Sequence, residues 1–322
     1  MHPLSHPGTG TSGPDGPGDA DGTPVATGLC VRIAGWTVAV ETTDAGLRDS
    51  LRRMFSRFMV SVAPGSEAVA RLEVIAPQVP RPAPDVRELP RVQRAPEGGL
   101  RLEGEDYSAT LSAEGLRATV VGQGRFPVET VLKVMLATEL ARRGGLLVHG
   151  VALAHQGHAA LFVGHSGAGK STLGGLWAGA GETLLSDELV AVWPEGTSGP
   201  GASAASRNPA TASSAVSTTR GFTWRAAGTP WNVGLPVEAS LVAVGTLAWD
   251  TGSRWESQSA GEVGRMLLLN ALLPEASATG RGGLLAAAGR MLSEVPPVRL
   301  VFARDASAAQ VVRDALEAAT HD

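Results

Sequence analysis

The chain is poor in cysteine and in lysine, and each shortage limits what it can be. Cys30 is the one cysteine among 322 residues, which rules out an internal disulfide and any metal site made of several cysteines. Its apolar neighbours in "GLCVRI" favour a small buried side chain over a reactive thiol. Lysine occurs only at Lys133 and Lys170, and arginine supplies the other basic side chains. With alanine and glycine so abundant, we interpret the scarcity of lysine as compositional bias.

Long apolar runs are also missing. No run reaches the roughly 18–20 residues needed to span a bilayer, and the N-terminal stretch has no apolar segment typical of a signal peptide. We therefore expect a cytoplasmic protein with no membrane partner. The net charge of −4 and the pI near 6.0 argue against broad nucleic-acid binding. An apolar content of 43% is enough for a sizeable folded core.

Composition divides the chain into three parts. Residues 1–27 are rich in Gly, Pro, Asp, Ser and Thr and bury too little surface to fold, so they predict a disordered tail. Residues 28–145 show the pattern of a smaller α+β domain, and residues 146–322 that of an α/β domain. Within the latter, the Ser/Ala/Gly-rich residues 195–219 predict a low-complexity loop.

Periodicity predicts the elements of the first domain. Two strands flank a turn at 34–35, and a helix covers 45–59. A further strand includes "ARLEVIA", and residues 99–121 predict successive short strands. Next comes a long helix, which Pro127 opens, with Glu129 in its first turn and a Gly-Gly pair after its end.

A glycine-rich motif in the second domain carries the clearest chemistry. "GHSGAGKS", residues 164–171, fits the phosphate-binding spacing G-x-x-x-x-G-K-[ST], with an apolar strand before it and a helix opening at Lys170. Backbone N–H groups of such a loop surround phosphate oxygens, the lysine reaches the outer phosphates, and the serine hydroxyl binds Mg²⁺. The expected nucleotide-binding residues are Gly164, Ser166, Gly167, Ala168, Gly169, Lys170, Ser171 and Thr172.

An acidic pair follows at a short distance. In "LLSDELV", Asp187 and Glu188 end a predicted strand 17 residues after Lys170, the length of one helix and a return strand. A carboxylate there can hold Mg²⁺ or accept a proton from an attacking hydroxyl. The alternative interpretation of the acidic pair is a solvated turn between two strands. His149 lies in the apolar strand "LLVHGVAL". Its position alone fits either a hydrogen-bonded core residue or a residue of the site.

Three other histidines fit less specific roles. His155 and His158 flank a predicted tight turn and are expected to be solvated. His165 occupies a variable position of the glycine-rich motif and is expected to be a bystander.

Together, "LLVHGVAL", "LFVGHSGAGKSTL" and "LLSDELVAVW" resemble the catalytic domain of HPr kinase/phosphorylase, whose fold core is shared with ATP-dependent phosphoenolpyruvate carboxykinase. The resemblance covers about residues 146–305 and is most specific in the first 50 of them, with "AAGTPWNVG" similar to a segment common among relatives. It implies a P-loop kinase domain of this type with a mixed β-sheet. At "TTRGF", Thr218 stands where HPr kinases have a metal-binding glutamate, which argues against phosphorolysis and against HPr as substrate.

The resemblance also implies roles and partners. His149 matches the histidine near the transferred phosphate, Asp187 the base, and Ser171 with Glu188 the Mg²⁺ ligands. The expected function is ATP-dependent transfer of the γ-phosphate to a hydroxyl of a peptide, protein or small molecule, and hexamers in the family suggest a homo-oligomer.

Other functions stay open at this point. The chief alternative is a catalytically weak nucleotide-binding module that regulates, or docks peptides in, a peptide-modification system. A carboxykinase acting on a small keto acid fits less well, because no carboxylate-binding cluster is evident after residue 195.

Overall fold

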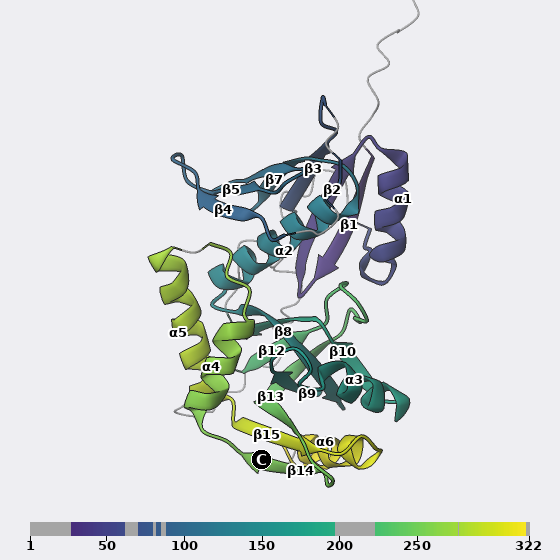
Figure 1. Cartoon of the computed structure of the whole chain (residues 1–322), viewed down its shortest axis with the longest axis vertical. Coiled ribbons are helices and arrows are strands. Elements are labelled where there is room, and N and C mark those ends of the chain that lie inside the picture. The colour runs from purple at the N-terminus through teal and green to yellow at the C-terminus, as the bar shows by residue number, and fades with distance from the viewer. Residues whose placement is uncertain are drawn as a thin grey trace, which may run out of the picture.

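The computed structural model describes residues 27–61, 70–79, 82–84, 88–196, 223–275 and 277–319. The tail expected at 1–27 and the loop expected at 195–219 lie outside these residues except at their edges, and so does Thr218. The described chain is a mixed α/β structure with two mixed β-sheets, one above the other in Figure 1.

The first sheet contains seven strands among the described residues: β1 (Thr27–Ile33), β2 (Trp36–Thr42), β3 (Ala70–Ile75), β4 (Arg91–Arg94), β5 (Leu100–Glu103), β6 (Ser108–Leu111) and β7 (Arg117–Val121). Their order is β1-β2-β3-β7-β6-β5-β4, with β2, β3 and β7 parallel and the other pairs antiparallel. The β1–β2 turn holds Ala34 and Gly35 at positive φ, as a tight hairpin requires. The alternating burial of β3 places one of its faces in the core.

The helices of the first part differ in detail from the sequence prediction. Helix α1 (Ala45–Met54) is capped by Asp44 and ends five residues before the predicted boundary, where a 3₁₀ turn, η1 (Ser56–Phe58), follows. Helix α2 (Arg125–Arg142) begins two residues before Pro127. Glu129 therefore lies beyond the first turn, where it pairs with Arg125 at i,i+4.

Helix α2 lies between the two sheets in Figure 1 and packs against β7 of the first sheet. On its other side it contacts β8 (Leu146–His155) and β11 (Leu189–Pro194) of the second. One hydrophobic cluster runs from the first sheet through α2 to Leu147, Ala191 and Trp231. The helix thus joins the two sheets through a shared core.

The second sheet adds six strands to β8 and β11: β9 (His158–Val163), β10 (Thr183–Ser186), β12 (Trp224–Ala227), β13 (Glu238–Trp249), β14 (Arg254–Ser257) and β15 (Pro297–Phe302). The pairings β8–β11–β12–β13–β9 close on themselves, because β9 pairs with both β13 and β8. Strands β9, β13 and β15 are parallel, so their carboxyl ends share one edge of the sheet. Residues that follow these strands are therefore neighbours.

Helices cover the second sheet on both faces. Helices α3 (Lys170–Gly179) and α6 (Ser307–Ala318) pack on one apolar cluster, and α4 (Ala260–Asn270) and α5 (Ala278–Glu294) on another. Strands β4, β12 and β14 have only four residues each and no clean apolar alternation, and sequence patterns do not predict them.

Candidate functional site

The glycine loop, residues 164–169, connects β9 to α3 at the shared edge of the parallel strands. Gly167 and Gly169 have φ of 82° and 101°, which L side chains rarely adopt. Gly169 is also crowded, since a Cβ there would lie 2.5 Å from Trp249 and 2.8 Å from Phe302. A Cβ at Gly164 would lie 2.8 Å from that of Ala168. The loop therefore depends on its glycines for both backbone conformation and space.

Lys170 is buried beneath this loop, with 7% of its surface exposed. Its Nζ donates to the carbonyl oxygens of Gly164 at 2.8 Å and His165 at 3.2 Å. Burial lowers the pKa of Lys170. Among the described residues, no carboxylate forms an ion pair with it. A buried ammonium balanced only by carbonyl dipoles is favourably placed to gain an anion.

The N-terminus of α3 also favours the binding of an anion. Its N-cap is Gly169, and no side chain in the described part of the chain caps the helix. The first N–H groups of a helix have no partner within it and carry a partial positive charge, which favours phosphate. Ser166, Ser171 and Thr172 are exposed around this helix end. The eight residues expected to bind nucleotide therefore lie on one continuous loop and helix start.

The acidic pair lies between β10 and β11, beside α3. The Cβ of Asp187 is 3.5 Å from the position that a Cβ would take at Gly174, one helical turn beyond Lys170. Because a turn rises about 5.4 Å, Asp187 lies alongside the beginning of the helix that carries the glycine loop. Asn232 fixes its orientation by donating from Nδ2 to Asp187 Oδ1 at 2.8 Å.

The segment 228–235, which includes Asn232, is anchored to both strands that flank the acidic pair. Thr229 Oγ1 donates to the carbonyl of Leu189 at 2.6 Å, and the amide of Leu235 donates to that of Leu185 at 3.0 Å. Gly234 approaches the Thr229 carbonyl so closely that a Cβ would overlap it. In sequence this segment stands out only by its resemblance to relatives, and no local pattern joins Asn232 to Asp187, so the sequence does not predict their contact.

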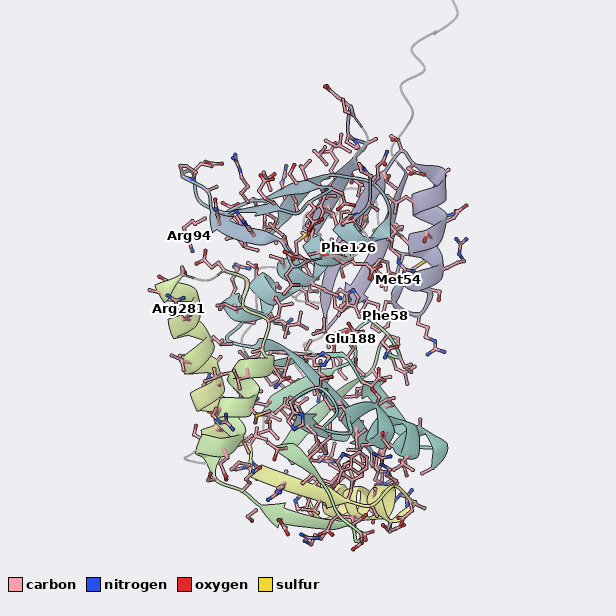
Figure 2. All side chains as sticks on the ribbon, in the orientation of Figure 1. Met54, Phe58, Arg94, Phe126, Glu188 and Arg281 are labelled. Atoms are coloured by element: carbon pink, nitrogen blue, oxygen red, sulfur yellow. The ribbon has the colours of Figure 1, made fainter. Side chains whose placement is uncertain are left out.

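Glu188 lies against α2, and Figure 2 shows it at the junction of the two sheets. The Nζ of Lys133 on α2 lies 3.7 Å from Glu188 Oε1 and 5.4 Å from the centre of the buried Trp231 ring. Burial raises the pKa of Glu129, one turn earlier on α2, against the lowering effect of Arg125 and Lys133. Lys133 is rare in type for this sequence, but no local pattern connects it to the site.

His149 lies on β8 directly opposite Leu189 on β11, one residue from the acidic pair. The side chain is exposed, the one such position on β8. Partial burial, followed by the charge of Lys170, lowers the pKa of His149 despite the opposing charges of Glu188 and Asp187. The imidazole is therefore mainly neutral at pH 7, and it lies within electrostatic range of both lysines and both acids.

Two histidines differ from the prediction that they are solvated. His155 keeps 13% of its side chain exposed and contacts Glu182 at 2.7 Å and Glu317 at 3.2 Å, tying β8 to α6. His158 has a buried Nδ1 with no hydrogen-bond partner among the described residues. The turn residues 156–157 are exposed, whereas the two histidines that flank them are partly covered. His165 is exposed and contacts its own loop at the Ser166 carbonyl.

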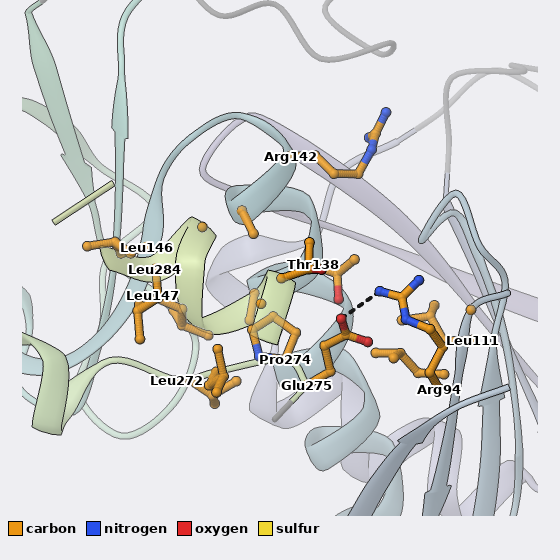
Figure 3. Close-up of a pocket in the computed structure, with 18 of the residues that line it drawn as sticks. Arg94, Leu111, Thr138, Arg142, Leu146, Leu147, Leu272, Pro274, Glu275 and Leu284 are labelled. Atoms are coloured by element: carbon orange, nitrogen blue, oxygen red, sulfur yellow. Dashed lines mark hydrogen bonds and ion pairs between the residues drawn. The ribbon is translucent and has the colours of Figure 1, made fainter. Parts of the chain in front are cut away.

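A cavity of about 340 Å³ lies elsewhere, between the first sheet, α2 and the α4–α5 connection (Figure 3). Its lining is mainly apolar, and none of the predicted site residues lines it. The Arg94–Glu275 ion pair crosses it at 2.5 Å, joining β4 to the α4–α5 connection. This cavity is separate from the glycine loop.

Comparison with known proteins adds no assignment: no family model and no curated protein matches the chain. Across the described ranges, no helix has both the length and the apolar character to cross a membrane. Nor do three or more His, Cys, Asp or Glu side chains gather there as a metal site. Mg²⁺ usually takes one or two protein carboxylates and completes its shell with phosphates and water. Of the two residues expected to hold it, Ser171 is exposed at the start of α3, and Glu188 lies against Lys133 of α2.

Proposed function

We propose that this protein is an ATP-dependent, Mg²⁺-requiring kinase that transfers the γ-phosphate to a hydroxyl of a peptide, protein or small-molecule acceptor. The observation that carries the proposal is the buried ammonium of Lys170, held by two carbonyls under a glycine loop whose helix N-terminus has no side-chain cap. A nucleoside triphosphate supplies the negative charge that this arrangement lacks.

Each residue of the site has a role in binding ATP or Mg²⁺ that follows from its position. The amides of residues 164–172 and Lys170 bind the β- and γ-phosphates, and His149 faces the transferred phosphate as a neutral hydrogen-bond donor. Ser171 and Glu188 would hold Mg²⁺, which would supply positive charge to offset the charge that develops on the phosphate oxygens during transfer.

Asp187 acts as the base. The acceptor oxygen forms a bond to the γ-phosphorus while the bond to the β–γ bridging oxygen breaks, ADP leaves, and the acceptor's proton passes to the Asp187 carboxylate. Asn232 orients that carboxylate through its 2.8 Å hydrogen bond. The proximity of Asp187 to the first turns of α3 supports this role, since the base has to reach a hydroxyl lined up with the γ-phosphate.

The test is transfer from labelled ATP with Mg²⁺ to a panel of hydroxyl-bearing peptides and small molecules, alongside ATP binding. Asp187→Asn preserves shape and removes the base, so transfer falls about 10²- to 10⁴-fold while ATP binding stays within about twofold. Asp314→Asn, at an exposed position of α6, is the matched control and leaves both unchanged. Lys170→Met loses ATP binding.

Each other outcome has a definite meaning. An Asp187→Asn enzyme that transfers phosphate at the wild-type rate contradicts the base role. A wild-type chain that binds ATP tightly and labels no acceptor supports the alternative, a nucleotide-binding regulatory or peptide-docking module. A chain that binds no adenine nucleotide refutes the proposal as a whole.

A further inference from the structure

Lys133 is one of only two lysines in a chain whose other basic side chains are arginine. The second is Lys170, under the glycine loop. Lys133 belongs to α2, which packs on the first sheet, yet its side chain points to the acidic pair of the second. Both lysines therefore converge on one site from separate parts of the fold.

The surroundings of Lys133 restrain its ammonium group without giving it a short hydrogen bond to a carboxylate. The Trp231 ring, 1% exposed, forms a rigid surface 5.4 Å from Nζ, where a cation–π contact restrains the side chain. The 3.7 Å to Glu188 Oε1 exceeds the roughly 2.7–2.9 Å of a charge-assisted hydrogen bond. With 26% of the side chain exposed, the ammonium remains reachable from solvent.

Building on the proposed kinase function, we propose that Lys133 is a second phosphate-binding residue, which contacts the γ-phosphate of ATP from the side of α2. Glu188 holds Lys133 in the nucleotide-free protein. Once Glu188 turns to Mg²⁺, the Lys133 ammonium is free to bind the phosphate oxygens nearest to it. The first part of the chain thereby contributes directly to the nucleotide site.

The charges around His149 agree with this arrangement. Lys170 and Lys133 both act on its imidazole, as do Glu188 and Asp187. All four charges therefore lie in the neighbourhood of one ring on β8. A γ-phosphate between the glycine loop and the acidic pair would have Lys170 on one side and Lys133 on the other.

The experiment compares the binding of ATP and ADP, each with Mg²⁺, because only ATP carries the γ-phosphate. Lys133→Met is expected to weaken ATP binding about 10- to 100-fold, the range for a lost hydrogen bond to a charged group. ADP binding stays within about twofold. Arg142→Met removes a cation from the far end of the same helix and leaves both affinities unchanged.

Chemical rescue separates charge from structure. In a Cys30→Ser background, Lys133→Cys is the one cysteine, and alkylation with bromoethylamine rebuilds a lysine-like ammonium. Alkylation is expected to restore most of the preference for ATP, while the melting temperature is the same before and after.

Three results overturn the inference. If Lys133→Met keeps the wild-type ratio of ATP to ADP affinity, Lys133 does not contact the γ-phosphate, and the proposed function stands. If both affinities fall together with the melting temperature and alkylation restores neither, the lysine is structural. If the wild-type chain binds no adenine nucleotide, the proposed function fails and this inference fails with it.

Discussion

Gly169→Ala tests the geometry of the glycine loop most directly. Gly169 caps α3 with φ of 101°, a conformation that costs a residue with a side chain about 1–3 kcal/mol. The added methyl group would also lie 2.8 Å from Phe302 Cζ and 2.5 Å from Trp249 Cζ2. The substitution therefore combines backbone strain with overlap.

The two aromatic rings differ in how far they can yield. Trp249 is 37% exposed, whereas Phe302 is fully buried and packs against Trp249 with ring centres 4.3 Å apart. Overpacking of this kind costs about 1–3 kcal/mol. Together with the backbone term, the native loop loses about 2–6 kcal/mol, a large part of the roughly 5–15 kcal/mol that stabilises a whole domain.

The loop is expected to relax into another shape instead of unfolding the protein, and its amides then no longer converge on a phosphate. A loss of about 2 kcal/mol corresponds to ATP binding about 30-fold weaker. Equilibrium titration with ATP measures this, and thermal unfolding followed by circular dichroism shows whether the fold is kept.

Gly175→Ala is the matched control. Gly175 is exposed, lies within α3, and a Cβ there meets nothing within 4 Å. Alanine stabilises a helix interior by about 0.5–1 kcal/mol relative to glycine, so this variant should melt slightly higher and bind ATP normally. If Gly169→Ala binds ATP as well as Gly175→Ala does, the loop does not require the left-handed glycine, and the reasoning is wrong.

Two predictions concern the packing around α3 and α6. Burial would raise the pKa of Glu182, but hydrogen bonds from His155 and Arg313 outweigh it and lower the pKa below its ordinary value of 4.5. A lowered carboxyl pKa contributes stability that is present above pH 4.5 and is lost as the pH falls through the folded-state pKa. Glu182→Gln should therefore melt lower than wild type at pH 7, and the gap should narrow below pH 4.5. If the difference in melting temperature between the two proteins stays constant across this pH range, the prediction is wrong. Trp177 is fully buried and donates to the Thr183 carbonyl at 3.0 Å. Trp177→Ala should therefore lower the free energy of unfolding in urea by about 3–5 kcal/mol. A loss smaller than that of Trp177→Phe would contradict this prediction.

The sequence alone determined the features that depend on neighbours along the chain. The glycine loop, the helix that starts at Lys170 and the return to Asp187 follow one another within a short segment, and local spacing and periodicity predict them. Alternating apolar residues likewise predicted most strands of the first sheet, and apolar runs predicted the strands next to the glycine loop and the acidic pair in the second. Local signals failed at short strands such as β12, whose four residues carry too little pattern.

Only the tertiary structure decided which distant residues complete the site. Asn232 reaches Asp187 because β12, which precedes its segment, lies between β11 and β13 in the sheet, and Lys133 reaches Glu188 because α2 packs between two sheets. Trp249 and Phe302 confine Gly169 because three parallel strands end at one edge. These contacts depend on strand order and helix packing, which result from the burial of the whole apolar surface and leave no periodic trace in any single segment.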